Sequence, residues 1–361
     1  MKTIKVRLKK RSYEIIIGSR ILRLLGKYVK KLNLGSDAYV ITNAYLKNKY
    51  GKLLKGALRA ARLSVRFKLV ADSEQSKSIN TASRVIEDLT RYDKKRRIFI
   101  IAFGGGVVGD LAGFIASVYK RGIPYVQVPT TLLAQVDSSI GGKTAVDLRQ
   151  GKNLIGAFYQ PRLVFSDVSL LESLKPRQVK AGLAEVAKYA VIKDARLFDY
   201  LEKNYRKILK TEEPALEFIV SRCSLIKARI VEQDEREERG IRTILNFGHT
   251  LGHAIEAAGS YKKYNHGEAV AIGMLLASDL SRKMKLLNQA PALRLEQLIR
   301  KLGLPDKIDG ISVKKIIAAH YRDKKFIGPK NRFVLTRGIG RTQIKEAVAL
   351  EAIKEVLKKR S

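Results

Sequence analysis

The spacing of hydrophobic positions along this chain changes at about residue 168. Before that point, short β-prone runs alternate with helical signals, which predicts a mostly parallel α/β sheet of the Rossmann-like kind. The run at 97–103, RIFIIAF, is apolar throughout, as expected of a strand buried on both faces. Ser76 or Ser78 would cap a helix over 78–92. The predicted strands are 3–8 and 12–17 (a hairpin), 38–42, 65–70, 97–103, 125–128 and 163–165.

After residue 168 the apolar residues recur at helical spacing. Pro176, Pro214 and Pro291 lie at or near the starts of predicted helices, where proline is tolerated. The predicted helices are 177–193, 195–209, 213–232, 244–258, 267–285, 291–302, 312–320 and 344–358. The chain is therefore expected to form an α/β domain over 1–167 and an all-α domain over 168–361.

The strong positive charge of the chain favours a negatively charged ligand. The chain has 71 Lys and Arg against 34 Asp and Glu, a formal net charge of +37. Such a surface attracts small anions and also, without specificity, nucleic acid. The basic residues are spread along the whole chain, and we find no zinc-finger spacing, basic zipper or aromatic RNA-binding signature. We therefore expect an anionic small molecule as ligand and no specific nucleic-acid partner.

Three features favour a cytoplasmic protein with no membrane partner. The longest apolar run, Ala269 to Ala277, is too short to span a bilayer as a helix. The first residues alternate charged with apolar side chains, unlike a signal peptide. The single cysteine, Cys223, cannot form an intrachain disulfide.

A glycine-rich segment follows the apolar strand at 97–103. Its sequence, GGGVVGD over 104–110, matches G-x-G-x-x-G between a strand and a helix, where backbone N–H groups can bind a phosphate. No acidic residue ends a strand about twenty positions later, so the match to a dinucleotide fingerprint is incomplete. The alternative is a structural tight turn.

A second polar segment, PTTLLAQVDSSIGGK over 129–143, also leaves a strand. Its paired glycines and Lys143 can hold an anion through backbone N–H groups and an ammonium. Gly151-Lys152-Asn153 repeats the pattern. Without further context, each lysine could equally be an ordinary surface residue.

Three of the four histidines lie within eighteen residues: His249, His253 and His266. His249 and His253 are four apart on a predicted helix and share a face. Two or three histidines with a carboxylate make a zinc site with an open position. The spacing leaves open which histidines bind and which carboxylate joins them, and it favours the pair His249 and His253.

Together these segments resemble the 3-dehydroquinate synthase family. The resemblance is carried by FGGGVVGDLAGFIASVYKRG (103–122), VPTTLLAQVDSSIGGKTAVD (128–147), GKNLIGAFYQP (151–161), GLAEVAKY (182–189), RTILNFGHTLGHAIE (242–256) and HGEAVAIGM (266–274), in the family's order. It implies an NAD-binding α/β domain and a helical metal-binding domain. It also implies that 3-deoxy-arabino-heptulosonate 7-phosphate is converted to 3-dehydroquinate and phosphate while NAD is regenerated.

The resemblance also assigns roles to residues. The implied metal ligands are Glu185, His249 and His266, for zinc with cobalt as the alternative, and His253 is implied at the substrate. The implied NAD-binding residues are Asn43, Glu74, Lys77, Gly105, Gly106, Val107, Asp110, Thr130, Thr131, Leu133, Asp137, Ser138, Lys143, Lys152, Asn153 and Ser173, where the family often has threonine at the last. The implied substrate and catalytic residues are Asp137, Lys143, Asn153, Lys188, Lys227, Arg242, Asn246, His253 and Lys324 or Lys325, with Arg121 reaching the partner's site in a homodimer.

Two other enzyme classes remain as rivals. A related sugar-phosphate cyclase would take a substrate without the carboxylate, which Arg242 and Lys227 argue against. A metal-dependent polyol dehydrogenase would release NADH, whereas SSIGGKTAVD and GKNLIG favour the synthase.

Overall fold

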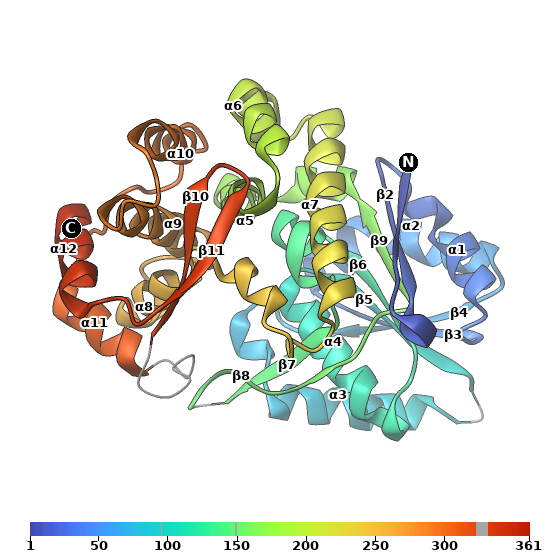
Figure 1. The fold of residues 1–361 in the computed structure, drawn as a ribbon. Coiled ribbons are helices and arrows are strands. Elements are labelled where there is room, and N and C mark those ends of the chain that lie inside the picture. Colours follow the sequence, from blue (N-terminus) through green and yellow to red (C-terminus); the bar gives the residue numbers. More distant parts are fainter. Residues whose placement is uncertain (95, 149, 323–330) are drawn as a thin grey trace. The chain divides into compact units, whose positions relative to one another are not determined.

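The computed structural model describes residues 1–94, 96–148, 150–322 and 331–361 (Figure 1). The chain forms two compact units: unit 1 is residues 1–174 with 216–236, and unit 2 is residues 175–215 with 237–361. Helix α7 (Glu213–Gln233) belongs to unit 1 except for its first turn. The chain thus passes between the units at three places, where the sequence had suggested one boundary at residue 167.

Unit 1 is built on a seven-stranded sheet of order β1-β2-β9-β6-β5-β3-β4. Only the pair β1–β2 is antiparallel; the other pairs are parallel, as predicted. Every strand predicted before residue 168 is present. Their bounds are β1 Lys2–Val6, β2 Tyr13–Gly18, β3 Asp37–Thr42, β4 Ser64–Leu69, β5 Ile98–Gly104, β6 Tyr125–Pro129 and β9 Leu163–Asp167.

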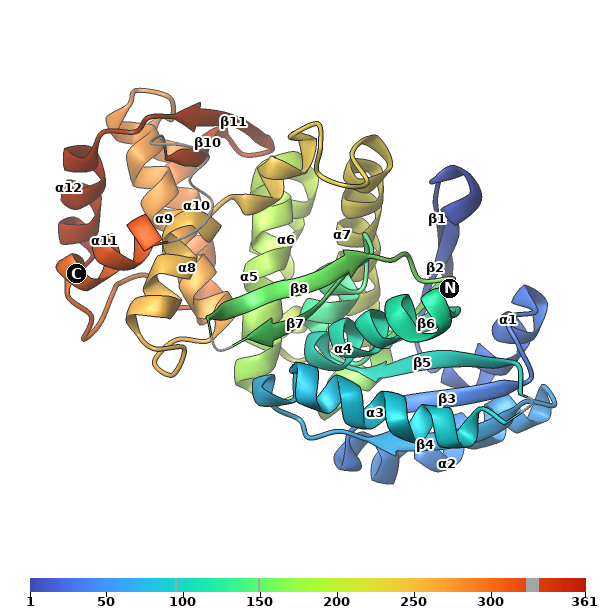
Figure 2. The ribbon, with the colours of Figure 1, turned by 90° about the horizontal axis from the view of Figure 1, so that it is seen from below.

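Strand β5 is buried on both faces, as its unbroken apolar sequence predicts. Phe99 and Ile101 join the cluster under α1 (Leu25–Leu32) and α2 (Ala44–Ala60). Ile98 and Ile100 join the cluster under α3 (Ile79–Tyr92) and α4 (Gly106–Val118). The strand's period of two therefore places helices on both faces of the sheet (Figure 2).

The predicted cap of α3 is Ser78, whose Oγ accepts from the backbone N–H of Thr81 at 3.3 Å. A feature missed from the sequence is the hairpin of β7 (Lys143–Leu148) and β8 (Gly151–Phe158). Its two lysine-bearing glycine segments looked like isolated anion loops. In the structure they are the entry to β7 and the start of β8, and β7 packs on α4.

Unit 2 is mostly helical, as predicted. Its helices are α5 Pro176–Lys193, α6 Ala195–Leu209, α8 His249–Ala258, α9 His266–Lys283, α10 Gln289–Lys301, α11 Val313–Arg322 and α12 Leu350–Arg360. Two predicted boundaries were wrong. The helix expected from residue 244 begins at His249, because Gly248 has φ +79°. The helix expected from residue 344 begins at Leu350, because β10 (Arg332–Gly338) and β11 (Arg341–Glu346) form a hairpin there.

Helix α9 is the central element of unit 2 and is buried on nearly all sides. It contacts α5, α8, α10, α12 and β10. At Gly273 the helix runs against the turn before α8, where an added Cβ would lie 1.9 Å from the carbonyl oxygen of Gly248. No helix in the described part of the chain is long and apolar enough to cross a membrane.

This close approach predicts that Gly273→Ala destabilises the protein. The methyl group has no space, so the turn before His249 must move, at a cost of about 1–3 kcal/mol. Gly56→Ala is the matched control. Gly56 is exposed in α2 with no atom within 4 Å of an added Cβ, so alanine there should stabilise by roughly 0.5–1 kcal/mol. Urea unfolding of both variants measures the two signs; a Gly273→Ala protein as stable as the parent would contradict the packing described.

Candidate functional site

Three side chains from three helices of unit 2 converge on one buried point. Glu185 lies within α5 and is 1% exposed, His249 opens α8, and His266 opens α9. The Oε1 atom of Glu185 is 3.2 Å from Nε2 of His249 and 3.2 Å from Nε2 of His266. One ligand atom from each of the three residues lies within 4.8 Å of the other two, as a metal site with three protein ligands requires.

The start of α9 is fixed locally by a capping box. Asn265 Oδ1 accepts from the backbone N–H of Glu268 at 2.9 Å, and Glu268 Oε2 accepts from the backbone N–H of Asn265 at 2.9 Å. Arg177 Nε donates to Glu268 at 2.7 Å. Glu268 is thereby committed to the helix cap, and His266 is held at the first helical position.

Hydrogen bonds behind the rings leave both Nε2 atoms available to a metal. Nδ1 of His249 is 3.1 Å from the carbonyl oxygen of Phe247, which can only accept, so Nδ1 carries the proton. Nδ1 of His266 is 3.2 Å from Oε2 of Glu256, again an acceptor when ionised. With the Nδ1 proton held in place, each ring can present an Nε2 lone pair to a metal once Nε2 has lost its own proton, so the donor set fits a divalent ion such as zinc.

Neighbouring charges shift the pKa values of these three buried groups in directions that partly oppose the effect of burial. Burial alone would raise the pKa of Glu185, but the Lys188 ammonium and the two histidines lower it well below its ordinary value. Burial also lowers the pKa of His249, with Glu185 opposing. For His266 burial acts the same way, but the hydrogen bonds that its ring donates to Glu185 and Glu256 raise its pKa to about 10. The carboxylate of Glu185 is therefore ionised and surrounded by Lys188 and two histidines that can carry positive charge.

His253 lies beside this set without belonging to it. Its ring centroid is 5.3 Å from that of His249 and 5.9 Å from that of His266. With Glu256 and His266 it forms a second group of potential ligands. The helical spacing that favoured His249 and His253 correctly placed both rings on one face, but Glu185 comes from a separate helix that spacing could not find.

Two further predicted residues of unit 2 lie on the segments around the histidines. Arg242 and Asn246 belong to the short helix η7 (Ile241–Asn246) just before α8. Arg242 is 2% exposed, and its Nε is 3.2 Å from Oε1 of Glu237. Lys188, one turn along α5 from Glu185, forms an ion pair with that carboxylate. The predicted Lys324 or Lys325 lies outside the described residues.

In unit 1 the glycine-rich segment forms the turn from β5 into α4. Gly105 precedes the helix, Gly106 and Val107 open it, and Asp110 lies in its first turns. An added Cβ on Gly105 would lie 2.9 Å from Cγ2 of Thr131, and one on Gly106 would lie 3.1 Å from Oγ of Ser138. The glycines thus serve tight packing against the second polar segment, the structural alternative considered above, while keeping the helix N-terminus open to a phosphate.

A lysine that follows β4 joins α4 to β8. Lys77 Nζ donates to Oδ2 of Asp110 and to Oδ1 of Asn153, each at 2.5 Å. Burial raises the pKa of Asp110, and Lys77 opposes that shift. Lys152 Nζ lies 3.4 Å from Oε1 of Glu74, in the short helix η3 (Glu74–Ser76). The structure therefore brings together five residues predicted to bind NAD.

Asp137 lies in a π-helical turn, η5 (Ala134–Ser138), directly after Thr130, Thr131 and Leu133. Lys227 from α7 donates to its backbone oxygen at 2.9 Å and to Oδ1 at 2.7 Å. Such π turns are frequent at functional sites. The carbonyl of Asp137 also accepts from the backbone N–H of Ile140 at 3.0 Å, so Lys227 adds a second hydrogen bond to it while orienting the carboxylate.

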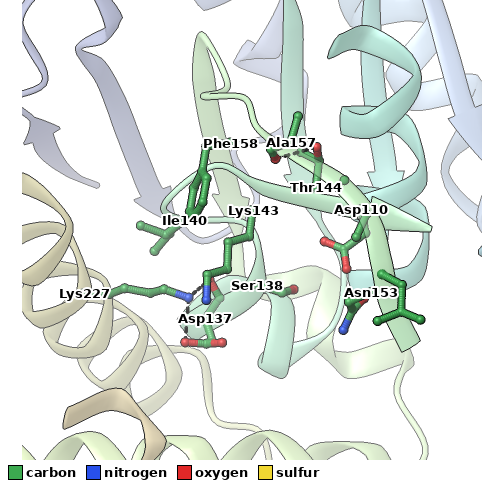
Figure 3. A pocket seen from close by; sticks show the side chains of 13 residues that line it. Asp110, Asp137, Ser138, Ile140, Lys143, Thr144, Asn153, Ala157, Phe158 and Lys227 are labelled. Atoms are coloured by element: carbon green, nitrogen blue, oxygen red, sulfur yellow. Dashed lines mark hydrogen bonds and ion pairs between the residues drawn. The ribbon is translucent and has the colours of Figure 1, made fainter. Parts of the chain in front are cut away.

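A cavity of about 470 Å³ opens at this turn. Figure 3 shows Lys143 and Lys227 reaching toward Asp137, with Asp110 and Asn153 together on the other side. Six predicted residues line it, namely Asp110, Asp137, Ser138, Lys143, Asn153 and Lys227. The apolar part of the wall was not predicted and comes largely from the missed hairpin: Ile140, Thr144, Ala145, Leu154, Gly156, Ala157 and Phe158.

Asn43, Ser173 and Arg121 lie outside both the cavity lining and the contacts described above. Asn43 is buried and caps α2, with Oδ1 accepting from the backbone N–H of Leu46 at 2.8 Å. Ser173 ends the short helix η6 (Val168–Ser173) and donates to the carbonyl of Leu170 at 2.7 Å. Arg121 is exposed in η4 (Tyr119–Arg121) with φ +62°. Their roles toward ligand or partner stay predictions.

Comparison with known proteins gives one consistent family. Family models described as 3-dehydroquinate synthase N-terminal and C-terminal match residues 67–181 and 182–326. The chain is 47% identical to a 3-dehydroquinate synthase of Desulforamulus reducens over 345 residues, covering 95% of this chain and 96% of that protein. It is 44% identical to one of Thermoanaerobacter pseudethanolicus, covering 99% and 100%.

Solved structures of similar fold include sugar-phosphate cyclases. A 2-epi-5-epi-valiolone synthase of Streptomyces hygroscopicus, with NAD⁺ and Zn²⁺ bound, matches with TM-score 0.88 and 29% identity over 98% of each chain. A 2-deoxy-scyllo-inosose synthase with carbaglucose-6-phosphate, NAD⁺ and Co²⁺ matches with TM-score 0.89 and 27% identity over the whole of each chain. A probable glycerol dehydrogenase of Sinorhizobium meliloti, with TM-score 0.67 and 16% identity over 96% and 95%, shares the fold alone.

Proposed function

The chain belongs to the 3-dehydroquinate synthase family, and we propose that it catalyses the reaction of that family. It converts 3-deoxy-arabino-heptulosonate 7-phosphate into 3-dehydroquinate and phosphate in the shikimate pathway, as a phosphate-eliminating carbon–oxygen lyase. The observation that carries this proposal is the buried set of Glu185, His249 and His266, whose donor atoms point at one another. The cytoplasmic location expected from the sequence stays a prediction.

The residues present suit one divalent metal and NAD. Glu185, His249 and His266 would hold the metal, zinc being the first choice because two imidazoles and a carboxylate are its ordinary ligands. Residues around the glycine turn and the Lys77 contacts would hold NAD. When bound, the metal supplies Lewis-acid polarisation of a substrate oxygen, and NAD supplies a reversible hydride acceptor.

The side chains of unit 2 near the metal set suit a doubly anionic substrate. Arg242 is buried, and its Nε lies 3.2 Å from Oε1 of Glu237, so the guanidinium is already inside the unit before a ligand arrives. Lys188 is 2% exposed beside Glu185. A buried ammonium and a buried guanidinium bind carboxylate or phosphate through charge-assisted hydrogen bonds. We assign them, with Asn246 and His253, to binding and orienting the substrate.

In unit 1, Lys143, Lys227 and Asp137 meet at the cavity. The ion pair of Lys227 with Asp137 fixes the carboxylate oxygen that can accept from a substrate hydroxyl. Holding one substrate in place through several chemical steps supplies the proximity contribution to the rate. These side chains bind and orient; the hydride and the polarising charge come from the cofactors.

Turnover measured on the purified protein tests this function. With 3-deoxy-arabino-heptulosonate 7-phosphate, a catalytic amount of NAD and zinc, phosphate and dehydroquinate should appear together in equal amounts without accumulating NADH. Chelation should remove the activity, and added zinc should restore it. Turnover of a cyclase substrate that lacks the carboxylate, with none of the heptulosonate, would favour a related cyclase. Steady NADH release from a polyol would favour a dehydrogenase.

We also propose the homodimer that the family resemblance implies. In this chain the support is the edge strand β8. Leu154 and Phe158 are 37% and 40% exposed, partly at the cavity wall, and no charged side chain lies between them. β8 carries one cation, Lys152, at its start, whereas edge strands β1 and β4 carry cations further along, such as Lys5 and Arg66, that discourage pairing. An unprotected edge of this kind can pair with its own copy.

Light scattering on the eluting protein tests the dimer. The parent chain should show twice the mass of one 40.5 kDa chain. Ala157→Lys places a charge on β8 beside the cavity and should shift the mass toward one chain, with mass and not activity as the readout because Ala157 also lines the cavity. A parent protein that elutes with the mass of one chain at micromolar concentration would contradict the proposal.

A further inference from the structure

A second buried carboxylate, Glu256, lies directly behind His266. It is 7% exposed and belongs to the same helix as His249 and His253. The three residues are spaced i, i+4 and i+7, so α8 presents them on one face. Nδ1 of His266 is 3.2 Å from Oε2 of Glu256, while its Nε2 is 3.2 Å from Oε1 of Glu185. The imidazole of His266 thus lies between two carboxylates.

We propose that Glu256 is a positioning residue for the metal centre, acting through His266; this rests on the proposed ligand set. An ionised carboxylate only accepts, so Glu256 fixes the proton of His266 on Nδ1 and turns the Nε2 lone pair toward the metal position. It also makes the ring a better electron donor. The carboxylate belongs to unit 2 alone, so the inference depends on one unit only.

The two histidine ligands are backed by different groups. His249 donates from Nδ1 to the neutral carbonyl of Phe247, whereas His266 donates to a carboxylate. A carboxylate raises ligand basicity more than a carbonyl does, so His266 is expected to be the stronger donor. Burying a carboxylate is costly unless a partner compensates it. The contact with His266, itself facing a cation when the metal is bound, supplies that compensation.

A purely structural role for Glu256 makes a different prediction. In that case its removal lowers the stability of α8 but leaves zinc affinity unchanged in the protein that folds. If Glu256 were instead a direct metal ligand, in the second group with His253, a third prediction would apply. Removing His253 would then weaken zinc binding as much as removing Glu256. Metal affinity therefore separates the three roles, and catalytic activity is not needed as a readout.

The test measures the zinc dissociation constant of metal-free protein by competition with a chromophoric chelator. Glu256→Ala should weaken zinc binding about 10–100-fold, the range typical of lost partners behind metal ligands. Glu256→Gln keeps the volume and a neutral acceptor, so its loss should be smaller. If the alanine variant does not fold, the zinc affinity of Glu256→Gln still tests the proposal. The visible spectrum of bound cobalt should change in both variants, because the orientation of His266 changes.

Glu268→Gln is the matched control. It removes a charge two residues from His266 that binds Arg177, but glutamine keeps the oxygen that accepts from the backbone N–H of Asn265 in the capping box, so zinc affinity should equal the parent's. His253→Ala should also retain it. Parent-like affinity and cobalt spectra in both Glu256 variants would overturn the positioning role, as would a loss in His253→Ala equal to that in Glu256→Ala. Retention of zinc by His249→Ala would instead overturn the ligand set itself.

Discussion

The buried carboxylate of Glu185 is the constraint on which unit 2 depends. A carboxylate that is 1% exposed is strongly destabilising unless positive charge and hydrogen-bond donors surround it. Lys188 comes from the same helix, and His249 and His266 come from the first positions of two others. Those positions depend in turn on Gly248 before α8 and on the Asn265 capping box before α9. The charge compensation of Glu185 therefore depends on the same helix starts that set the packing around α9.

Unit 1 follows the same physical logic with a different chemistry. Lys77 compensates Asp110, and Lys227 compensates Asp137, each across elements distant in sequence. The parallel sheet supplies the loops at the ends of β5 and β6 on which these carboxylates lie, where ligands of open α/β sheets usually bind. The net charge of +37 favours the approach of an anionic substrate. Most of the 71 Lys and Arg residues are not among the cations that compensate these carboxylates.

Much of the fold could be predicted from the sequence, because strands such as β5 and helices such as α9 have a strong and simple hydrophobic period. The hairpins β7–β8 and β10–β11 could not. The strands β7 and β8 begin at glycine and lysine segments that resemble loops. Strand β11 is short and exposed, so its hydrophobic pattern is too weak to separate it from the helix that follows. At the site, histidine clustering found the correct region. Glu185 was reached only through family resemblance, and Glu256 was overlooked although it lies seven residues after His249 on the same face.

The central claim is that Glu185, His249 and His266 together hold one divalent metal. The most direct measurement is a crystal structure of zinc-loaded protein, with anomalous diffraction recorded on both sides of the zinc absorption edge. The account predicts one strong peak, present only above the edge, within about 2.0–2.2 Å of a Glu185 oxygen and of Nε2 of both histidines. A peak bound instead by His253 and Glu256, or no peak at this position in protein that contains zinc, would contradict it.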